Sequence, residues 1–337
     1  MKRRCFTLVE LLVVIGIIAV LMGILLPALN AVKRSAQRVM CGTNLSGIGR
    51  SMQLYANEHG GEYPQAGNRS NLGDPKWGTA GTISAWLSTT GTQWGTVGTD
   101  TAVTVTSSLF LLVKYEDVTP AQFICKGDVG TKEFKLSDGT GLPNTTIDQI
   151  TDVWDFGDHA TMTDASGKHW PGQYNSYSYS DPYRNTVNNM SYPRSSTSNP
   201  ASPLCADRNP YLDKNAKGVY LEGKAAGVSA SEAGPSWYNN AYYDPDKTGN
   251  AAAHQREGQN VLFNDGHVNF AKLPNVGINK DNIWKCWVTP GAPPTNPADT
   301  EVGQVPYSGL TNDGTPASAA PGGEDDAFLV SENNAGH

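Results

Sequence analysis

The sequence predicts an α+β protein in which a long N-terminal helix packs on a small antiparallel β-sheet head with long loop insertions. Three observations predict this fold. Residues 6–32 are almost entirely apolar, residues 33–58 carry apolar side chains at helical spacing, and residues 260–270 have the pattern of a β-hairpin. The 36 Gly and 21 Pro among 337 residues indicate that the rest of the head is rich in loops.

The N-terminal segment is long enough to span a membrane. From Phe6 to Val32 it contains one charged residue, Glu10, and as a helix it reaches roughly 40 Å, whereas a hydrocarbon core is about 30 Å thick. Basic residues at positions 2–4 precede the segment and place the N-terminus on the cytoplasmic side. We therefore expect a single-pass membrane protein with residues 33–337 outside.

The carboxylate of Glu10 distinguishes this segment from a secretory signal peptide and from a plain membrane anchor. A secretory signal peptide has a shorter apolar region, and a plain anchor explains the length but not a carboxylate. A carboxylate deep in a span costs about 2.5–3.5 kcal/mol, so it indicates a functional residue. The alternative is that Glu10 lies near the interface and reaches the water.

Residues 3–12, RRCFTLVELL, resemble the class III signal of type IV pilins and type II secretion pseudopilins. The resemblance implies that a prepilin peptidase cuts between Cys5 and Phe6 and methylates the new amine on Phe6. Cys5 stands where the family usually has Gly. Pro27 falls where the family commonly has a proline, which removes a helix hydrogen bond and can kink or locally melt the helix.

This resemblance also implies an organisation and a function. The expected parts are a leader at 1–5, a helix at 6–58 with 6–32 in the inner membrane, a head at 59–288 in the periplasm or cell exterior, and a Pro/Gly-rich tail at 289–337. The implied function is that of a structural subunit of a type II secretion pseudopilus or a type IV pilus-like filament, not an enzyme.

The implied partners are other pseudopilins, the prepilin peptidase, the membrane and the secretion or pilus assembly machinery. In lipid, the cationic amine of Phe6 would pair with Glu10 of a neighbouring subunit, and such a pair sets register. The net charge of −7 argues against nucleic acid as a binding partner, because such a partner requires a basic surface. Two other functions stay open: a membrane-anchored module that displays a ligand or glycan site, and an anchored metal-dependent hydrolase.

The remaining elements follow from local patterns. We expect one helix from Thr7 to Glu58, ended by Gly60 and Gly61, with Gly42 as the position where it could bend. The hairpin turns at Asp265-Gly266, since Gly accepts a positive φ. Other segments are assigned as follows: 107–115 as a short helix or a buried strand, 122–125 and 174–180 as strands, 185–204 as a loop, and 289–337 as an edge segment or a disordered tail.

The head also resembles a large pseudopilin-like family whose signature is a His, about nine residues, and then Asp-Gly. Here Cys41-Gly42-Thr43-Asn44-Leu45 follows the span, and His254 precedes Asp265-Gly266 by ten intervening residues. His254, Asp265 and His267 are low-ranked candidates for a metal site, because imidazole and carboxylate groups bind metals. The preferred interpretation gives them turn and packing roles. Asp207 could join them or could form a salt bridge.

Two further sites are weaker candidates. Asp313, Asp325 and Asp326 offer oxygen ligands for calcium, which related pseudopilins bind, although no EF-hand spacing is present; otherwise no cofactor is expected. Aromatic residues at 154–170 and 237–243 could form a sugar-binding surface, but more often such residues fill a core.

Four cysteines lie outside the expected span: Cys41, Cys125, Cys205 and Cys286. An oxidising compartment permits disulfides, and four cysteines allow three pairings. We place Cys41 with Cys125 first because that bond would fasten the helix to the head. Buried free thiols are the alternative.

Overall fold

A computed structural model describes residues 8–65, 105–128, 131–135, 149–152, 155–156, 174–180, 192, 194–210, 250–284 and 324–330. The helices are α1 (Leu8–Glu58) and α2 (Val105–Tyr115). The strands are β1 (Tyr177–Ser180), β2 (Pro203–Asp207), β3 (Gln259–Phe263), β4 (Val268–Ala271) and β5 (Leu329–Val330). Short 3₁₀ helices are η2 (Pro120–Phe123), η4 (Ile150–Asp152), η7 (Ala252–His254) and η8 (Ile278–Lys280).

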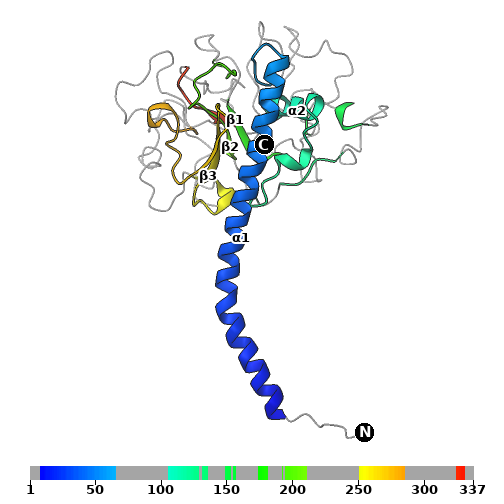
Figure 1. Ribbon diagram of the computed structural model, residues 1–337, viewed down its shortest axis with the longest axis vertical. Coiled ribbons are helices and arrows are strands. Elements are labelled where there is room, and N and C mark those ends of the chain that lie inside the picture. The colour runs from blue at the N-terminus through cyan, green and yellow to red at the C-terminus, as the bar shows by residue number, and fades with distance from the viewer. Residues whose placement is uncertain are drawn as a thin grey trace, which may run out of the picture.

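The long N-terminal helix is present as predicted. It runs unbroken through Pro27 and Gly42, so the local melting considered for Pro27 does not occur. The half of α1 that extends away from the head is gently curved (Figure 1). Beyond the helix, Gly60 and Gly61 adopt positive φ, and Gly61 donates its backbone N–H to the carbonyl of Ala56.

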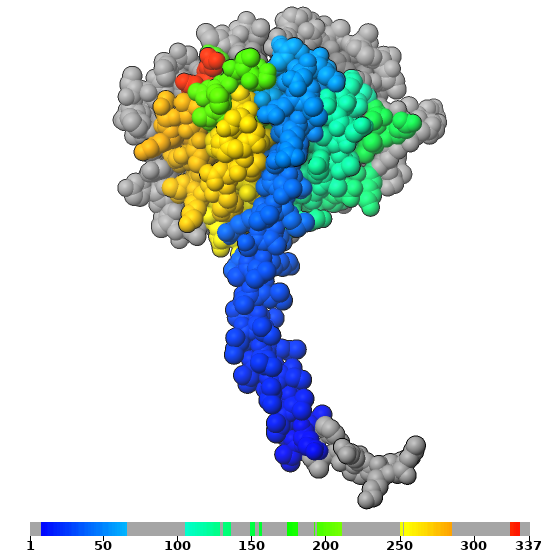
Figure 2. Space-filling model, viewed as in Figure 1, coloured from blue at the N-terminus to red at the C-terminus, as the bar shows by residue number. Residues whose placement is uncertain are grey.

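The second half of α1 buries one face against the head. Its buried side chains recur at helical spacing: Cys41, Leu45, Ile48, Met52, Tyr55 and Ala56. In Figure 2 this half runs across the head between the segment around α2 and the segment that carries β3 and β4. The helix therefore forms part of the core on both sides.

The head contains a five-stranded sheet in the order β4-β3-β2-β1-β5, and every neighbouring pair is antiparallel. The five residues of β3 are all buried, because this strand lies inside the sheet and under α1. A Cβ atom on Gly49 of α1 would lie 2.8 Å from Leu262 Cδ1. The absence of a side chain on Gly49 therefore lets α1 approach the sheet closely.

The predicted hairpin is β3 and β4. Gln259 pairs with Ala271 at one end and Leu262 with Val268 at the other. Gly266 lies in the turn at φ +88° and donates its N–H to the carbonyl of Phe263. A left-handed Gly at this position is what the Asp-Gly pattern predicts.

The segment at 107–115 is a helix, which settles that choice. α2 is almost fully buried, and Phe110 packs edge-on against Phe134 and Phe156. Phe123 meets Phe156 in the same way, with ring centroids 4.9 Å apart. These rings form the core on the α2 side of α1.

Two local predictions are wrong. Residues 122–125 are not a strand: Pro120 begins the 3₁₀ helix η2, because its fixed φ suits a helical turn. The loop predicted at 185–204 ends early, since Pro203 and Leu204 open β2. This strand is short, begins with a proline and ends with Asp207, and it is held by hydrogen bonds to β1 and β3 on either side.

Part of the C-terminal tail belongs to the sheet. Leu329 and Val330 form β5, which pairs with β1 at the sheet edge. The buried guanidinium of Arg194 donates to the backbone carbonyls of Glu324 and Asp326. The edge-segment expectation therefore holds for the described residues 324–330.

Candidate functional site

The first half of α1 is a solvent-exposed apolar rod. Leu8 is 78% exposed and Ile24 is 70% exposed, and no side chain of the most apolar 18-residue window is buried against the head. By length and composition α1 is able to cross a membrane. Glu10 lies exposed in the first turn of the rod, whereas Cys5 and Phe6 fall outside the described residues.

Polar contacts begin where the rod meets the head. Arg34 Nη1 donates to Gln255 Oε1 at 3.3 Å, and Gln37 Nε2 donates to the Lys126 carbonyl at 3.0 Å. Arg38 forms an ion pair with Glu257, and its guanidinium carbon lies 4.6 Å above the centre of the Phe270 ring. These contacts mark the boundary between the exposed and the buried halves of α1.

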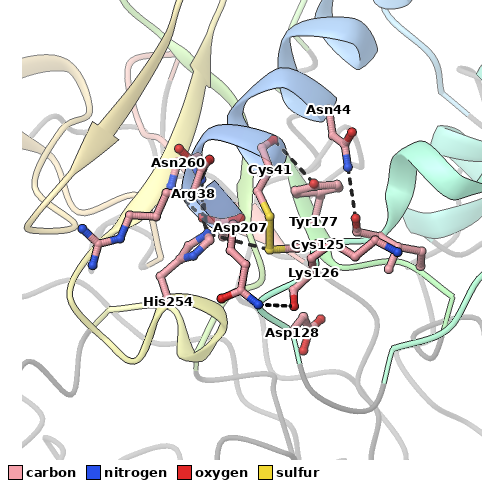
Figure 3. Close-up of a disulfide and its surroundings, with 12 residues drawn as sticks. Arg38, Cys41, Asn44, Cys125, Lys126, Asp128, Tyr177, Asp207, His254 and Asn260 are labelled. Atoms are coloured by element: carbon pink, nitrogen blue, oxygen red, sulfur yellow. Dashed lines mark hydrogen bonds and ion pairs between the residues drawn. A yellow bond between two sulfur atoms is a disulfide. The ribbon is translucent and has the colours of Figure 1, made fainter. Parts of the chain in front are cut away.

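A disulfide lies just beyond this boundary. It joins Cys41 of α1 to Cys125, the pairing placed first from the sequence (Figure 3). Both cysteines are fully buried, and their Cα atoms are 5.2 Å apart. Asn44, one turn further along α1, donates to the carbonyl of Ile124 at 3.0 Å. The disulfide and this hydrogen bond fasten α1 to the chain that follows η2.

A buried polar group borders the disulfide. His254 Nε2 lies 3.7 Å from Cys125 Sγ and 3.1 Å from Asp207 Oδ2 (Figure 3). Asn260 Nδ2 lies 3.2 Å from the same imidazole nitrogen, and the Asn260 backbone N–H donates to Asp207 Oδ2 at 2.6 Å. Asp207 and His254 are at most 5% exposed. Four segments distant in the sequence therefore meet here.

This group is the one metal-compatible set among the described residues. One donor atom from each of Cys41, Cys125, Asp207 and His254 lies within 4.8 Å of all the others. The set differs from the one expected from the sequence, although it includes His254 and also Asp207, whose partner had been left open.

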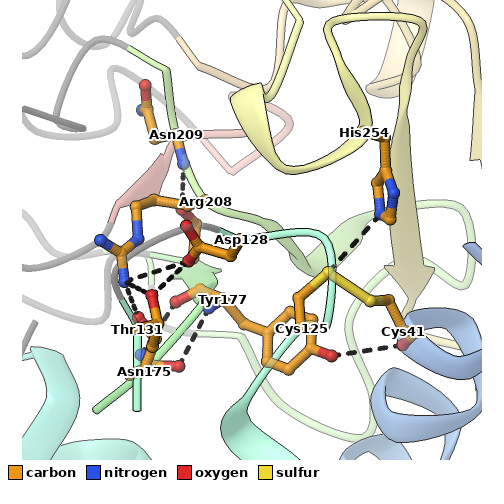
Figure 4. A network of polar contacts seen from close by, with 10 residues as sticks. Cys41, Cys125, Asp128, Thr131, Asn175, Tyr177, Arg208, Asn209 and His254 are labelled. Carbon is orange, nitrogen blue, oxygen red and sulfur yellow. Dashed lines mark hydrogen bonds and ion pairs between the residues drawn. A yellow bond between two sulfur atoms is a disulfide. The ribbon is translucent and has the colours of Figure 1, made fainter. Parts of the chain in front are cut away.

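A second buried network lies beside the first, on the other side of Tyr177 (Figure 4). Arg208 Nη2 lies 3.4 Å from Asp128 Oδ2, with both side chains almost fully buried. Thr131 links them, since it donates to Asp128 and accepts from Arg208 at 3.2 Å. Burial raises the pKa of Tyr177 well above its usual value, so its hydroxyl stays protonated and faces the Cys41 carbonyl.

Asp265 and His267 lie elsewhere and do not join His254. They flank the hairpin turn after β3, whereas His254 contacts Asn260 near the start of that strand, and five residues of strand span about 16 Å. Asp265 Oδ1 accepts the His267 backbone N–H at 3.0 Å, which is the turn role preferred above. That hydrogen bond lowers the pKa of the Asp265 carboxyl. The structure therefore does not bring His254 together with Asp265 and His267.

The structure describes only part of the other candidate sites, which are the calcium ligands, the aromatic surface and the remaining cysteines. Asp325 and Asp326 lie next to β5, and no group of three or more metal-ligating side chains forms around them among the described residues. Asp313, Cys286 and the aromatic residues at 237–243 fall outside the described residues, as do nearly all of 154–170. Cys205 is a buried free thiol in β2, and burial raises its pKa.

Sequence reasoning missed Asn260 and the Arg208–Asp128 pair. Asn260 directly precedes the apolar run Val261-Leu262-Phe263 in β3, and a polar residue buried beside such a run needs a hydrogen-bond partner. That signal was available. Nothing in the local pattern around Asp128 or Arg208 indicates that the two meet.

Comparison with known proteins gives a match at the N-terminus. Residues 1–26 match the family model of the prokaryotic N-terminal methylation motif. No curated protein and no solved structure gives a significant match to the chain. The resemblance of the head to the family with the His and Asp-Gly signature therefore stays a prediction. The chain thus carries a prepilin-type methylation motif on a long apolar helix that is packed, at its other end, on an antiparallel sheet.

Proposed function

We propose that the chain is a pilin-like structural subunit. A prepilin peptidase cuts it between Cys5 and Phe6 and methylates the Phe6 amine, and the first half of α1 then assembles into a type II secretion pseudopilus or a type IV pilus-like filament. The observation that carries the proposal is the exposed apolar half of α1, which projects from the head and bears the methylation motif.

The apolar first half of α1 must be shielded from water both in the membrane-bound subunit and in the filament. Exposing its leucine, isoleucine and valine side chains to water would cost a free energy of about 25 cal/mol per Å² of apolar surface. Lipid covers them in the membrane, and the same surfaces of neighbouring subunits cover them in a filament. The head begins only at about Arg34, so it leaves the rod accessible to both.

Glu10 gives this packing a register. The carboxylate lies in the first turn of α1, at the end remote from the head. Cleavage before Phe6 would create a cationic amine nearby, and the amine of one subunit can pair with Glu10 of the next. A buried ion pair contributes little net stability, but it penalises every register in which either charge is left alone.

The junction of α1 with the head transmits the load of assembly. A subunit held by its N-terminal rod is pulled through the residues where the rod enters the head. The Cys41–Cys125 disulfide lies at that entry, so the head cannot peel away from α1 without breaking a covalent bond.

Mass spectrometry of the protein from its native membrane tests the first step. The expected N-terminus is N-methylated Phe6. An intact Met1 would contradict processing, and a membrane-anchored display module would then be the better proposal.

Assembly is tested by the substitution Glu10→Ala. We expect it to abolish filaments recovered by shearing while leaving the membrane-bound subunit in place. Glu58→Ala is the matched control, since Glu58 is exposed at the opposite end of the same helix. Equal filament yields from the two variants would contradict a role for Glu10 in assembly.

A further inference from the structure

His254 Nε2 lies between the Asp207 carboxylate and the side-chain amide of Asn260. If Nε2 carries a proton, it donates to Asp207 Oδ2 at 3.1 Å but then faces the amide donor Asn260 Nδ2 at 3.2 Å. If Nε2 is unprotonated, it accepts from Asn260, and its lone pair then faces the carboxylate. With Nε2 protonated, Asn260 can direct its two amide hydrogens to Asp207 Oδ2 and to the carbonyl of Arg38, each 3.3 Å away, so Nε2 is satisfied by Asp207 alone.

A cation could take the place of the proton between His254 Nε2 and Asp207. It would attract the lone pair of His254 Nε2 and the Asp207 carboxylate at the same time. Asn260 would keep its alternative acceptor, because its Nδ2 also lies 3.3 Å from the carbonyl of Arg38. Asp207 Oδ1 is buried and has no hydrogen-bond partner in the described part of the chain, so the carboxylate retains capacity for a ligand.

The two sulfur atoms complete a set of four donor atoms. Zinc binds thiolate sulfur at about 2.3 Å and imidazole nitrogen or carboxylate oxygen at about 2.0–2.2 Å, which sets ligand atoms roughly 3.5 Å apart. The Cys125 Sγ–His254 Nε2 distance of 3.7 Å and the overall 4.8 Å limit of the group are close to that arrangement. The two sulfur atoms must separate, which requires that their bond be absent, and the donor pairs nearest the 4.8 Å limit must move closer together.

We propose that the reduced chain binds one zinc ion through Cys41, Cys125, His254 and Asp207, and that the disulfide and the zinc site are alternative fastenings of α1 to the head. The proposal concerns the junction and stands independently of filament assembly. Thiolate and imidazole donors favour zinc over the hard cations calcium and magnesium, which prefer oxygen ligands.

The chemistry balances in two steps. A dithiol reductant gives two electrons and two protons to the disulfide, which becomes two thiols while the reductant becomes a disulfide. The same two thiols exist in the chain before its cysteines are first oxidised. Zinc then displaces both protons and binds the two thiolates.

The surroundings are built to hold these ligands in place. The Asn260 backbone N–H fixes Asp207 Oδ2 at 2.6 Å, and the His254 ring packs edge-on against Phe270. A Cβ atom on Gly127 would lie 3.3 Å from His254 Nδ1, so the chain after Cys125 passes close to the imidazole. Such supporting contacts are what orient metal ligands.

The test uses the full-length chain in detergent with Co²⁺ as a spectroscopic probe. The chain is reduced with a phosphine, which becomes a phosphine oxide with oxygen from water, and is then handled without air. We expect one Co²⁺ per reduced chain with thiolate-to-cobalt charge-transfer absorption, which zinc abolishes by displacement. The oxidised chain is expected to show no such absorption, because two of the four ligands are then lost.

Variants locate the ion. His254→Gln and Asp207→Asn are expected to weaken Co²⁺ binding at least about tenfold. The matched controls are His267→Gln and Asp265→Asn, the same substitutions in the exposed turn pair, and they should leave binding unchanged. A reduced chain without thiolate absorption, or absorption with equal affinity in His254→Gln and Asp207→Asn, would overturn the proposal.

Folding is followed by circular dichroism in the same samples. If reduction unfolds the head, zinc is expected to restore the helical signal and to raise Tm with increasing concentration. A reduced chain that stays unfolded in zinc would equally overturn the proposal.

Discussion

Gly49 of α1 lies so close to Leu262 of β3 that a Cβ atom on the glycine would come within 2.8 Å of the leucine Cδ1. Leu262 is fully buried, so its side chain has little room to move away. The contact couples the helix to β3, an inner strand of the sheet.

Gly49→Ala should therefore lower the stability of the head. Overpacking a core costs about 1–3 kcal/mol, and the better helix propensity of Ala returns about 1 kcal/mol, so we expect a net loss of about 1 kcal/mol. Denaturant unfolding of the full chain in detergent measures it. In a Leu262→Ala background the same change should be neutral or stabilising; an equal loss in both backgrounds would contradict the contact.

Removal of the disulfide should have a larger effect. The bond closes a loop of 84 residues, for which chain entropy predicts about 4 to 5 kcal/mol. We expect the double substitution Cys41→Ser and Cys125→Ser to lower the unfolding free energy by about that amount in the presence of a chelator. Cys205→Ala, which removes a buried free thiol, is the control and should cost roughly 1 kcal/mol. Similar losses in both would show that the bond does not fasten α1.

The buried Arg208–Asp128 pair predicts a strong effect from a single charge deletion. Asp128→Ala leaves the guanidinium of Arg208 without its carboxylate in a site where both side chains are almost fully buried, which should cost about 3 kcal/mol. Glu257→Ala breaks the half-exposed pair with Arg38 and should cost less than about 1 kcal/mol. Thermal unfolding compares the two. A smaller loss for Asp128→Ala than for Glu257→Ala would contradict this account.

The hairpin turn predicts a small pH effect. The hydrogen bond from His267 lowers the pKa of Asp265, so the folded state binds that proton less tightly than the unfolded state does. The contribution is present above the ordinary value near 4 and is lost as the pH falls through the lowered pKa. Because Asp265 is largely exposed, Asp265→Asn should cost about 0.5 kcal/mol at neutral pH. Stability curves for the two proteins should converge in acid, and a constant gap would contradict the assignment.

Cys5 predicts a measurable effect on processing. The prepilin signal usually has Gly at this position, so Cys5→Gly should give cleavage at least as fast as that of the natural chain. Cys5→Leu should slow it, because a larger side chain precedes the cut bond. Pulse labelling followed by gel mobility and N-terminal mass spectrometry measures the processed fraction. Uncleaved protein in all three would mean that the peptidase does not recognise the motif.

Local patterns predicted the elements whose causes are local. The apolar run and the helical spacing up to Glu58 predicted α1, and Asp265-Gly266 predicted the β3–β4 hairpin, because a turn needs a residue that accepts positive φ. β2 escaped prediction because its five residues are held by hydrogen bonds from β1 and β3 rather than by their own pattern. For the same reason the sequence left the tail between two alternatives, an edge segment and a disordered tail, and the pairing of β5 with β1 decides for the edge segment at residues 329–330.

The sequence by itself determined that an apolar helix with a single early carboxylate begins the chain and continues into an amphipathic half, since both properties are set by neighbouring residues. Only the tertiary structure decided which cysteines pair and which side chains surround them. Three pairings of the four cysteines were open, and no spacing links Asp207 or Asn260 to His254. The packing of α1 against the sheet brings them together, and a contact between distant residues depends on the whole fold rather than on any one segment.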